Sequence, residues 1–421
     1  MRVPTSSKTM PLNATLWRLA SAIVSILAMF VTCVTIATSV TQAAPHEEGA
    51  CCCVLHQYES AQPSAGARVA TSDEKPRIPA RGLAAKKPGG ELELFDFERA
   101  PLGDYDVLID VWYCGVCHTD VHSVDGDHGA PGDLSAFPMV SGHEVVGQVR
   151  EVGAKVTKHR PGDMVGVGPF KAACGVCEFC RKGEEQYCPH AMFTNHYGGG
   201  FANNIVAQEE FAFKIPDGVP LEQVAPLLCA GITTYTPIKL AGVRAGDRCA
   251  VVGFGGLGDM AVKFLLAKGA KVTIFDINET KSARAKELGC EFISAADEET
   301  KATLASQFDF ILTTVPARYE IQPYVNMLRP GGKLYCVGAP NAPTSLHLVS
   351  LLPHRTLCGT MSGSNADYAE MLQYCAENRI FSDVRTISYE EINEVFRKLR
   401  EGTGKFRYVL DVRTLPKREK P

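Results

Sequence analysis

The sequence predicts an α/β protein built from two domains, a β-rich domain followed by a doubly wound parallel sheet. Between about residues 81 and 229, short strand-like runs are divided by glycine turns, a pattern typical of a compact β module. From about Gly231 onward, short apolar strands alternate with helical patterns, which gives parallel βαβ units. The length of 421 residues also exceeds what one hydrophobic core usually holds.

The individual elements follow from local pattern. In the β-rich part, Val107–Tyr113 and Met139–Val152 alternate or cluster β-branched residues, and we expect both to be strands. In the second part, the expected strands are Arg248–Val252, Lys271–Phe275, Phe308–Thr313 and Lys333–Val337. A helix is expected from the glycine loop after Val252 through Lys268, and another over Glu279–Leu288.

Composition limits the class of protein and its partners. Apolar residues make up 45% of the chain and charged residues 21%, as in an ordinary globular protein. A formal net charge of −4 gives no electrostatic reason to expect a nucleic-acid partner. Sixteen cysteines are too few for a disulfide scaffold in a chain of this length, so their spacing carries the information.

The N-terminal residues 1–44 do not resemble the rest of the chain. They hold three basic and no acidic residues, and residues 19–44 are uncharged and largely apolar. This pattern leaves three interpretations open: a secretory signal, a signal-anchor helix and a dispensable extension. Membrane contact is therefore expected through residues 19–44 only. Residues 45–80, with the triplet Cys51–Cys53, are expected to form a disordered linker.

Four cysteines have the spacing of a closed metal site. They follow the pattern C-x2-C-x2-C-x7-C at Cys174, Cys177, Cys180 and Cys188. Thiolates two residues apart can turn inward together from a tight loop and supply a tetrahedral zinc ion. Two disulfides or an iron–sulfur cluster are the alternatives. Since all four donors come from protein, the predicted zinc is structural.

A second metal site is predicted from residues that lie far apart in the sequence. Cys117, His143 and Cys229 offer two thiolates and one imidazole, which would leave a fourth zinc position for water or substrate. Taken singly, Cys229 could be a core thiol and His143 a hydrogen-bonded turn histidine. The site depends on their joint occurrence.

A glycine-rich turn is expected to hold a dinucleotide. Gly253-Phe-Gly255-Gly256-Leu257-Gly258 follows a predicted strand and opens a predicted helix. Glycines there permit a tight turn and close approach of backbone to a pyrophosphate at the helix N-terminus. Eighteen residues after Gly258, Asp276 ends the next strand, where a carboxylate can accept hydrogen bonds from ribose hydroxyls.

Together these motifs resemble the medium-chain dehydrogenase/reductase superfamily, zinc-containing alcohol dehydrogenase type, and most closely its cinnamyl-alcohol-dehydrogenase-like branch. Five motifs carry the resemblance in order: residues 113–120 (YCGVCHTD), 141–147 (SGHEVVG), the four-cysteine lobe, 227–235 (LLCAGITTY) and 253–258 (GFGGLG). The resemblance implies a GroES-like catalytic domain over 81–230 with a zinc lobe at 171–189, a Rossmann domain over 231–362, and a return to the catalytic domain over 363–421. It does not extend to the first eighty residues.

The resemblance also implies a role for each matching residue. Cys117, His143 and Cys229 match catalytic zinc ligands, and Glu144 matches a nearby carboxylate that sometimes ligates. Asp120 matches the residue that orients the ligand histidine. Thr119 and His122 match a relay that carries the alcohol proton to solvent. The residues expected to contact the cofactor are Gly253, Gly255, Gly256, Leu257, Gly258, Asp276, Lys281, Thr233 and Arg407. Cys114 matches no ligand.

The expected activity is hydride transfer between NAD(P) and an alcohol or aldehyde. The alcohol is expected to be primary, and aromatic and allylic alcohols are included. Two zinc ions per chain are expected. The sequence 275–281 (FDINETK) departs from the cinnamyl-type branch, which holds a 2′-phosphate here, so NAD is favoured over NADP. Lys281 and Arg284 on the next helix could offset that preference. The alternatives are a polyol- or formaldehyde-type zinc dehydrogenase and a thiol-rich redox-sensing protein without enzymatic activity.

The resemblance further implies a homodimer or homotetramer whose partner is a small alcohol or aldehyde. We expect the catalytic part to be cytoplasmic, because zinc thiolates and free cysteines suit a reducing compartment. A membrane-anchored or secretory location stays open through the N-terminal segment.

Overall fold

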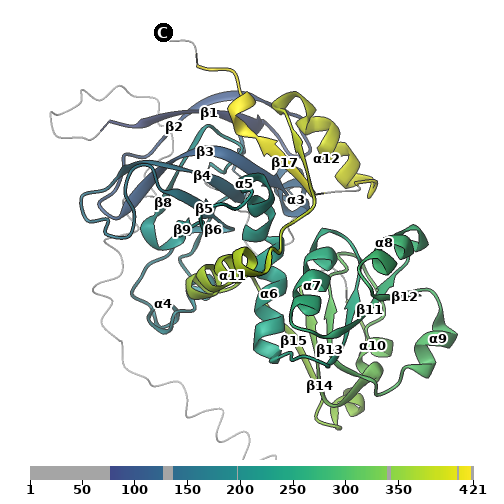
Figure 1. Ribbon diagram of the computed structural model, residues 1–421. Helices are drawn as coiled ribbons and strands as arrows, with labels where there is room; N and C mark the ends of the chain where they lie inside the picture. Colours follow the sequence, from purple (N-terminus) through teal and green to yellow (C-terminus); the bar gives the residue numbers. More distant parts are fainter. Residues whose placement is uncertain (1–75, 127–135, 197, 339–342, 405–406, 419–421) are drawn as a thin grey trace, which may run out of the picture. The chain divides into compact units, whose positions relative to one another are not determined.

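A computed structural model describes residues 76–126, 136–196, 198–338, 343–404 and 407–418 (Figure 1). The N-terminal segment 1–44 and nearly all of the predicted linker lie outside these residues. The first strand, β1, begins at Ile78, three residues before the predicted start of the catalytic domain.

The predicted parallel sheet is present. Six strands lie in the order β12-β11-β10-β13-β14-β15, and every neighbouring pair is parallel. The strands are β10 (Arg248–Val252), β11 (Lys271–Asp276), β12 (Glu291–Ser294), β13 (Phe308–Thr313), β14 (Leu328–Cys336) and β15 (Thr356–Gly359). The helices between them are α7 (Gly256–Ala267), α8 (Ser282–Glu287), α9 (Glu298–Thr303) and α10 (Gln322–Met327). This confirms the doubly wound α/β prediction.

Both faces of this sheet are buried, which explains its continuous apolar strands. Along β10, Cys249 and Val251 pack into one core cluster, whereas Ala250 and Val252 pack into another. Successive side chains of a strand point to opposite faces, so the two clusters lie on the two sides of the sheet.

Of the four predicted strands, β10 and β13 begin and end at the predicted residues, and β11 is one residue longer than predicted. Strand β14 covers Leu328–Cys336, whereas the predicted strand is Lys333–Val337. Its first part contains two glycines and pairs with β13 across a register shift, so the apolar strand pattern begins only at Lys333. The predicted helix Glu279–Leu288 is divided into the 3-10 turn η4 (Glu279–Lys281), which Asn278 caps, and α8.

The β-rich part contains a seven-stranded sheet in the order β16-β17-β3-β4-β5-β9, with β8 also paired to β3. All its pairs are antiparallel except β16 with β17. The strands are β3 (Asp106–Val116), β4 (Glu144–Val152), β5 (Met164–Val167), β8 (Asn204–Gln208), β9 (Phe213–Lys214), β16 (Val384–Ile387) and β17 (Arg407–Asp411). Since β16 and β17 come from the end of the chain, the C-terminal segment returns to this sheet (Figure 1).

The predicted strand Met139–Val152 is wrong in its first part. Only Glu144–Val152 forms β4, and Met139 makes an isolated bridge with Ala85. Gly142 has a φ of 97°, which a strand does not allow, so the chain turns here. The turn presents His143 at the start of β4.

The remaining elements complete the β-rich part and connect it to the parallel sheet. The small sheets are β1 (Ile78–Ala85) with β2 (Leu92–Arg99), and β6 (Phe170–Ala172) with β7 (Met192–Phe193). The helices are α3 (His118–Asp125), α4 (Glu178–Lys182), α5 (Leu221–Val224), α6 (Ala230–Ala241), α11 (Asn365–Asn378) and α12 (Ile392–Arg400). The 3-10 turns are η1 (Glu185–Tyr187), η2 (Glu209–Phe211), η3 (Ala225–Leu228), η5 (Leu348–Leu351), η6 (Tyr389–Glu391) and η7 (Val412–Thr414).

Among the residues described, no single helix has the length and apolar character needed to cross a membrane. One bent pair, Leu221–Leu228 with Ala230–Ala241, meets that test only when its two halves are taken together, by length and composition.

Candidate active site

Four buried side chains from three separate segments of the chain converge on one point. Cys117 caps the N-terminus of α3, His143 precedes β4, Glu144 begins that strand, and Cys229 lies at the break between η3 and α6. Their donor atoms lie within 4.8 Å of one another. The structure therefore brings together the three predicted ligands of the second metal site and the carboxylate that the resemblance placed near them.

The donor set fits a zinc ion. The sulfurs of Cys117 and Cys229 are 3.9 Å apart. Two thiolates at about 2.3 Å from a tetrahedral zinc would be about 3.8 Å apart, whereas a disulfide needs about 2.05 Å. The Nε2 atom of His143 is buried without a hydrogen-bond partner, as expected of an atom reserved for a metal.

The carboxylate of Asp120 holds two of the converging segments together. Its Oδ1 accepts hydrogen bonds from Ser141 Oγ (2.7 Å), the Gly142 amide (2.9 Å) and His143 Nδ1 (2.9 Å). Its Oδ2 accepts the amide of Cys117 at 2.9 Å. Because Nδ1 is thus engaged, the imidazole presents Nε2 to the site. Asp120 is completely buried.

The electrostatics of the thiols suit ligands. A hydrogen bond from Cys229 and the neighbouring His143 lower the pKa of Cys117 well below its usual range, against the effect of burial. The same bond raises the pKa of Cys229, so one proton serves both sulfurs. By contrast, burial and the charge of Asp120 raise the pKa of Cys114 well above its usual range, which keeps this nonligand thiol protonated.

Glu144 connects the metal site to the end of the chain. Its Oε1 accepts a hydrogen bond from Arg407 at the start of β17, while its Oε2 is buried without a partner. Burial raises the pKa of Glu144 to about 7, although Arg407 acts in the opposite direction. A Cβ on Gly256 would lie 2.5 Å from Arg407 Cδ, so Arg407 also covers the glycine turn.

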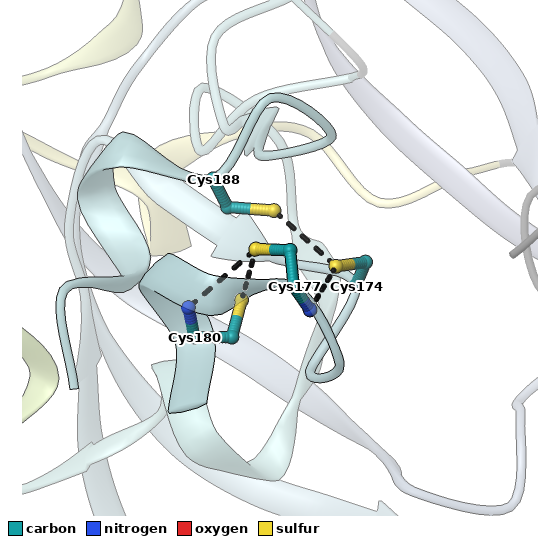
Figure 2. A group of neighbouring side chains, drawn as sticks. All are labelled: Cys174, Cys177, Cys180 and Cys188. Carbon is teal, nitrogen blue, oxygen red and sulfur yellow. Dashed lines mark hydrogen bonds between the residues drawn. The ribbon is translucent and has the colours of Figure 1, made fainter. Parts of the chain in front are cut away.

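The four cysteines of the predicted structural site form a second cluster (Figure 2). The sulfurs of Cys177 and Cys180 are 3.5 Å apart, and those of Cys174 and Cys188 are 3.6 Å apart, distances that exclude disulfides. The amide of Cys180 donates to Cys177 Sγ, and this bond lowers the pKa of that thiol to about 7. Four thiol donors at this spacing fit a tetrahedral zinc ion here as well.

The glycine turn has the shape that close approach of a phosphate requires. Gly253 has a φ of 91°, and a Cβ on Gly258 would lie 2.0 Å from the Gly253 carbonyl oxygen. A Cβ on Gly255, which caps α7, would meet nothing within 4 Å. The space over Gly255 thus faces the N-terminus of a twelve-residue helix. Arg407 Nε lies near this turn, buried and without a partner.

Asp276 lies at the end of β11, as predicted, but its oxygens are already engaged. Oδ2 accepts hydrogen bonds from the Phe254 amide (2.6 Å) and Lys281 Nζ (2.8 Å), and Oδ1 accepts the Asn278 amide (2.8 Å). Arg284 instead pairs with Asp383 at 2.7 Å. Lys281, and not Arg284, is therefore the basic group that acts on this carboxylate.

The other predicted residues have simpler settings. Thr119 and His122 lie on α3, where the rings of His118 and His122 are 5.1 Å apart. Thr233 lies in the first turn of α6, and its amide donates to the Cys229 carbonyl at 2.9 Å. Leu257 packs against the core, which leaves its backbone for a cofactor.

Sequence reasoning missed Tyr368. This tyrosine of α11 donates to the Leu228 carbonyl at 3.0 Å, directly before Cys229, and stacks on Phe213 with ring centroids 4.2 Å apart. It thereby fixes the segment that presents Cys229. No local pattern marks a tyrosine 140 residues further along the chain as its partner.

Comparison with known proteins agrees with this arrangement. Residues 103–217 match the alcohol dehydrogenase GroES-like domain, and residues 256–377 match the zinc-binding dehydrogenase domain. Cinnamyl alcohol dehydrogenase 8 of Arabidopsis thaliana is 39% identical over 345 residues, which cover 79% of this chain and 94% of that protein. The chain belongs to the zinc-containing alcohol dehydrogenases. Within them it falls in the cinnamyl-alcohol-dehydrogenase-like branch of the medium-chain superfamily, which confirms the predicted family.

Two further relatives of this alcohol dehydrogenase bear on its chemistry. The probable formaldehyde dehydrogenase of Bacillus subtilis is 38% identical, over 80% of this chain and 98% of that protein. The cinnamyl alcohol dehydrogenase of Helicobacter pylori, solved in complex with NADP(H), has a TM-score of 0.74 and 35% identity, covering 80% of this chain and 99% of that chain. The chain is thus an oxidoreductase of alcohols and aldehydes that uses zinc and a nicotinamide cofactor.

Replacement of Asp120 by asparagine is expected to lower the affinity of the buried site for zinc about 10–100-fold. An amide cannot accept all four hydrogen bonds, so His143 and Cys117 lose their common anchor. Competition with a chelator measures the affinity. Asp110→Asn, which disturbs only an exposed pair with Arg150, is the control and should bind zinc normally. Wild-type zinc affinity in Asp120→Asn would contradict the orienting role.

Proposed function

We propose that the chain oxidises primary alcohols, aromatic or allylic alcohols included, and reduces the corresponding aldehydes, with two zinc ions per chain. A catalytic zinc would be held by Cys117, His143 and Cys229, with Glu144 as a neighbouring carboxylate. A structural zinc would be held by the four-cysteine cluster. The observation that carries the proposal is the partnerless Nε2 of His143, buried beside two thiols 3.9 Å apart.

In this proposal each part of the site has one task. Zinc, when bound, supplies a Lewis acid that lowers the pKa of an alcohol, and the dinucleotide supplies the hydride acceptor. Asp120 orients the imidazole of His143. The Thr119 hydroxyl accepts the proton that the alcohol gives up while it passes its own proton on, and the His122 imidazole delivers a proton towards solvent. The glycine turn with Arg407 holds the pyrophosphate.

Polyol dehydrogenation and formaldehyde dehydrogenation are the alternative activities. The relative from Bacillus subtilis, a probable formaldehyde dehydrogenase, supports considering formaldehyde. A panel of aromatic, allylic and polyol substrates and formaldehyde, assayed with both cofactors, discriminates among them by kcat/KM. The non-enzymatic thiol sensor would need a broken cofactor loop or a missing relay, and the sequence keeps the glycines of the loop and the residues Thr119 and His122 proposed for the relay.

We propose NAD as the preferred cofactor. Asp276 supports this preference because a buried carboxylate at the end of β11 repels a 2′-phosphate. The ion pair with Lys281 weakens the repulsion, so the preference should be moderate.

We also propose that the chain forms a homodimer and works in a reducing compartment, with the catalytic part cytoplasmic. Strand β15 lies at the end of the parallel sheet, and the preceding residues Leu348, Val349 and Leu352 are 73%, 67% and 79% exposed. An open strand beside exposed apolar side chains favours a second copy as occupant. The cysteines of the described residues are all free, which suits reducing conditions.

Metal content and turnover test the catalytic assignment. The wild-type protein should hold two zinc ions per chain, and Cys117→Ala should lose one of them together with activity. Cys177→Ser should instead impair folding, because the binding energy of a structural zinc is also folding energy. Elemental analysis and steady-state assays check both. The buried nonligand Cys114 gives the control, since Cys114→Ala should keep both ions. Turnover that survives in Cys117→Ala would refute the assignment.

Cofactor preference tests the role of Asp276. Wild type should favour NAD about tenfold in kcat/KM, since one hydrogen bond from a ribose hydroxyl to the charged carboxylate of Asp276 contributes about 1.5–3 kcal/mol. Asp276→Ser should shift the preference towards NADP, mainly through KM. Lys281→Met leaves the carboxylate charge uncompensated and should strengthen the preference for NAD. Equal or better use of NADP by wild type would show that Lys281 outweighs Asp276.

Sedimentation velocity tests the dimer. Leu352→Lys should shift the protein towards monomer at micromolar concentration, because a charge in an apolar interface loses solvation. Leu240→Lys, at a leucine of α6 that is 56% exposed, is the matched control and should sediment as wild type. A wild-type protein that sediments as a monomer would rule out the proposed interface.

A further inference from the structure

Helix α3, which carries Thr119 and His122, is held through Ser123 by a residue that follows the four-cysteine lobe. Asn195 Nδ2 donates to Ser123 Oγ at 2.6 Å, and Ser123 Oγ donates to the Thr119 carbonyl at 2.9 Å. Ser123 is completely buried and Asn195 is 4% exposed. Since a hydroxyl has one proton, the bond from Asn195 directs the proton of Ser123 towards Thr119.

The position of Asn195 is set by the strands that enter and leave the four-cysteine loop. Strand β6 leads to Cys174, and β7, which follows Cys188, pairs with it. The next residue, Thr194, donates its backbone amide to the Pro169 carbonyl at 2.8 Å. Asn195 therefore has a fixed place as long as this loop is closed.

The ends of α3 are held by other contacts. At its N-terminus, Asp120 accepts the amide of Cys117, and at its C-terminus Asp125 pairs with Arg400 at 2.6 Å. The bond between Asn195 and Ser123 acts between these two ends, on the turn that contains the Thr119 carbonyl. It thus bears on the backbone that sets where the Thr119 hydroxyl lies.

We propose that Asn195 is a positioning residue for proton transfer, acting through Ser123 on Thr119. The four-cysteine loop then serves the reaction as well as the fold, because its two strands hold Asn195 against the relay helix. The inference rests on the proposed relay of Thr119 and His122. A displacement of about 1 Å in a reacting group can lower a rate about a hundredfold, so a small loosening of α3 is measurable.

The test compares pH profiles of alcohol oxidation. In Asn195→Ala, kcat at pH 7 should fall about tenfold. The KM for the alcohol and the KM for the cofactor should each change less than about twofold, and zinc content should stay at the wild-type level. The deficit should shrink as pH rises, because hydroxide in solvent can then take the proton without the relay. Ser123→Ala removes the same link from the other side and should give the same profile. The double variant should add little to either single one.

Thr194→Val is the matched control. It removes the bond from the Thr194 hydroxyl to the Gly168 carbonyl (2.7 Å) but keeps the backbone contacts that place Asn195, so Tm should fall while the pH profile keeps its wild-type form. The inference is overturned if Asn195→Ala and Ser123→Ala keep the wild-type profile, or if Thr194→Val reproduces theirs.

Thr119→Ala separates the inference from the proposed function. A wild-type pH profile in Thr119→Ala would mean that the relay itself is misassigned. An altered profile in Thr119→Ala, together with wild-type profiles in Asn195→Ala and Ser123→Ala, would leave the relay intact and overturn only the positioning role.

Discussion

The arrangement of the candidate active site depends on one buried carboxylate. Asp120 has no exposure to solvent, and each of its oxygens accepts hydrogen bonds. A buried charge without such partners would be strongly unfavourable, so the surrounding donors and the carboxylate require one another. The result is that the start of α3 and the loop before β4 keep a fixed distance. The sulfur of Cys117 and the imidazole of His143 are therefore held at a fixed distance from each other.

The two sheets contribute to the site in different ways. The antiparallel sheet supplies rigid strands from which α3 and His143 project, and its last strand, β17, brings Arg407 from the far end of the chain. The parallel sheet supplies the turn after β10 and the carboxylate after β11. Arg407 contacts both parts, because it pairs with Glu144 and lies over Gly256. The site therefore acquires its arginine only when the C-terminal segment has returned to the sheet.

Sequence reasoning succeeded where a residue acts through its neighbours in the chain. The strands β10 and β13, the four-cysteine spacing and the glycine turn all follow from local pattern. It failed where tertiary contacts decide. The strand expected from Met139 is interrupted because Gly142 turns to donate its amide to Asp120, and the sequence does not show that contact. Tyr368 and Asn195 were missed for the same reason, and the engagement of Asp276 by Lys281 became evident only from their distance.

The two cysteine-containing clusters differ in how much chain must be ordered before they form. Cys174 and Cys188 are 14 residues apart, whereas Cys117 and Cys229 are 112 residues apart. Loop-closure entropy grows with the logarithm of length, so closing the longer loop is about 2 kcal/mol less favourable. The short cluster can assemble from a nearly local segment, early in folding, with few contacts elsewhere. The cluster that contains Cys117 and Cys229 joins residues far apart in the sequence, so it forms only when the tertiary structure is complete. The two proposed zinc ions would therefore bind in a fixed order, first at the local cluster and last at the cluster of Cys117, His143 and Cys229.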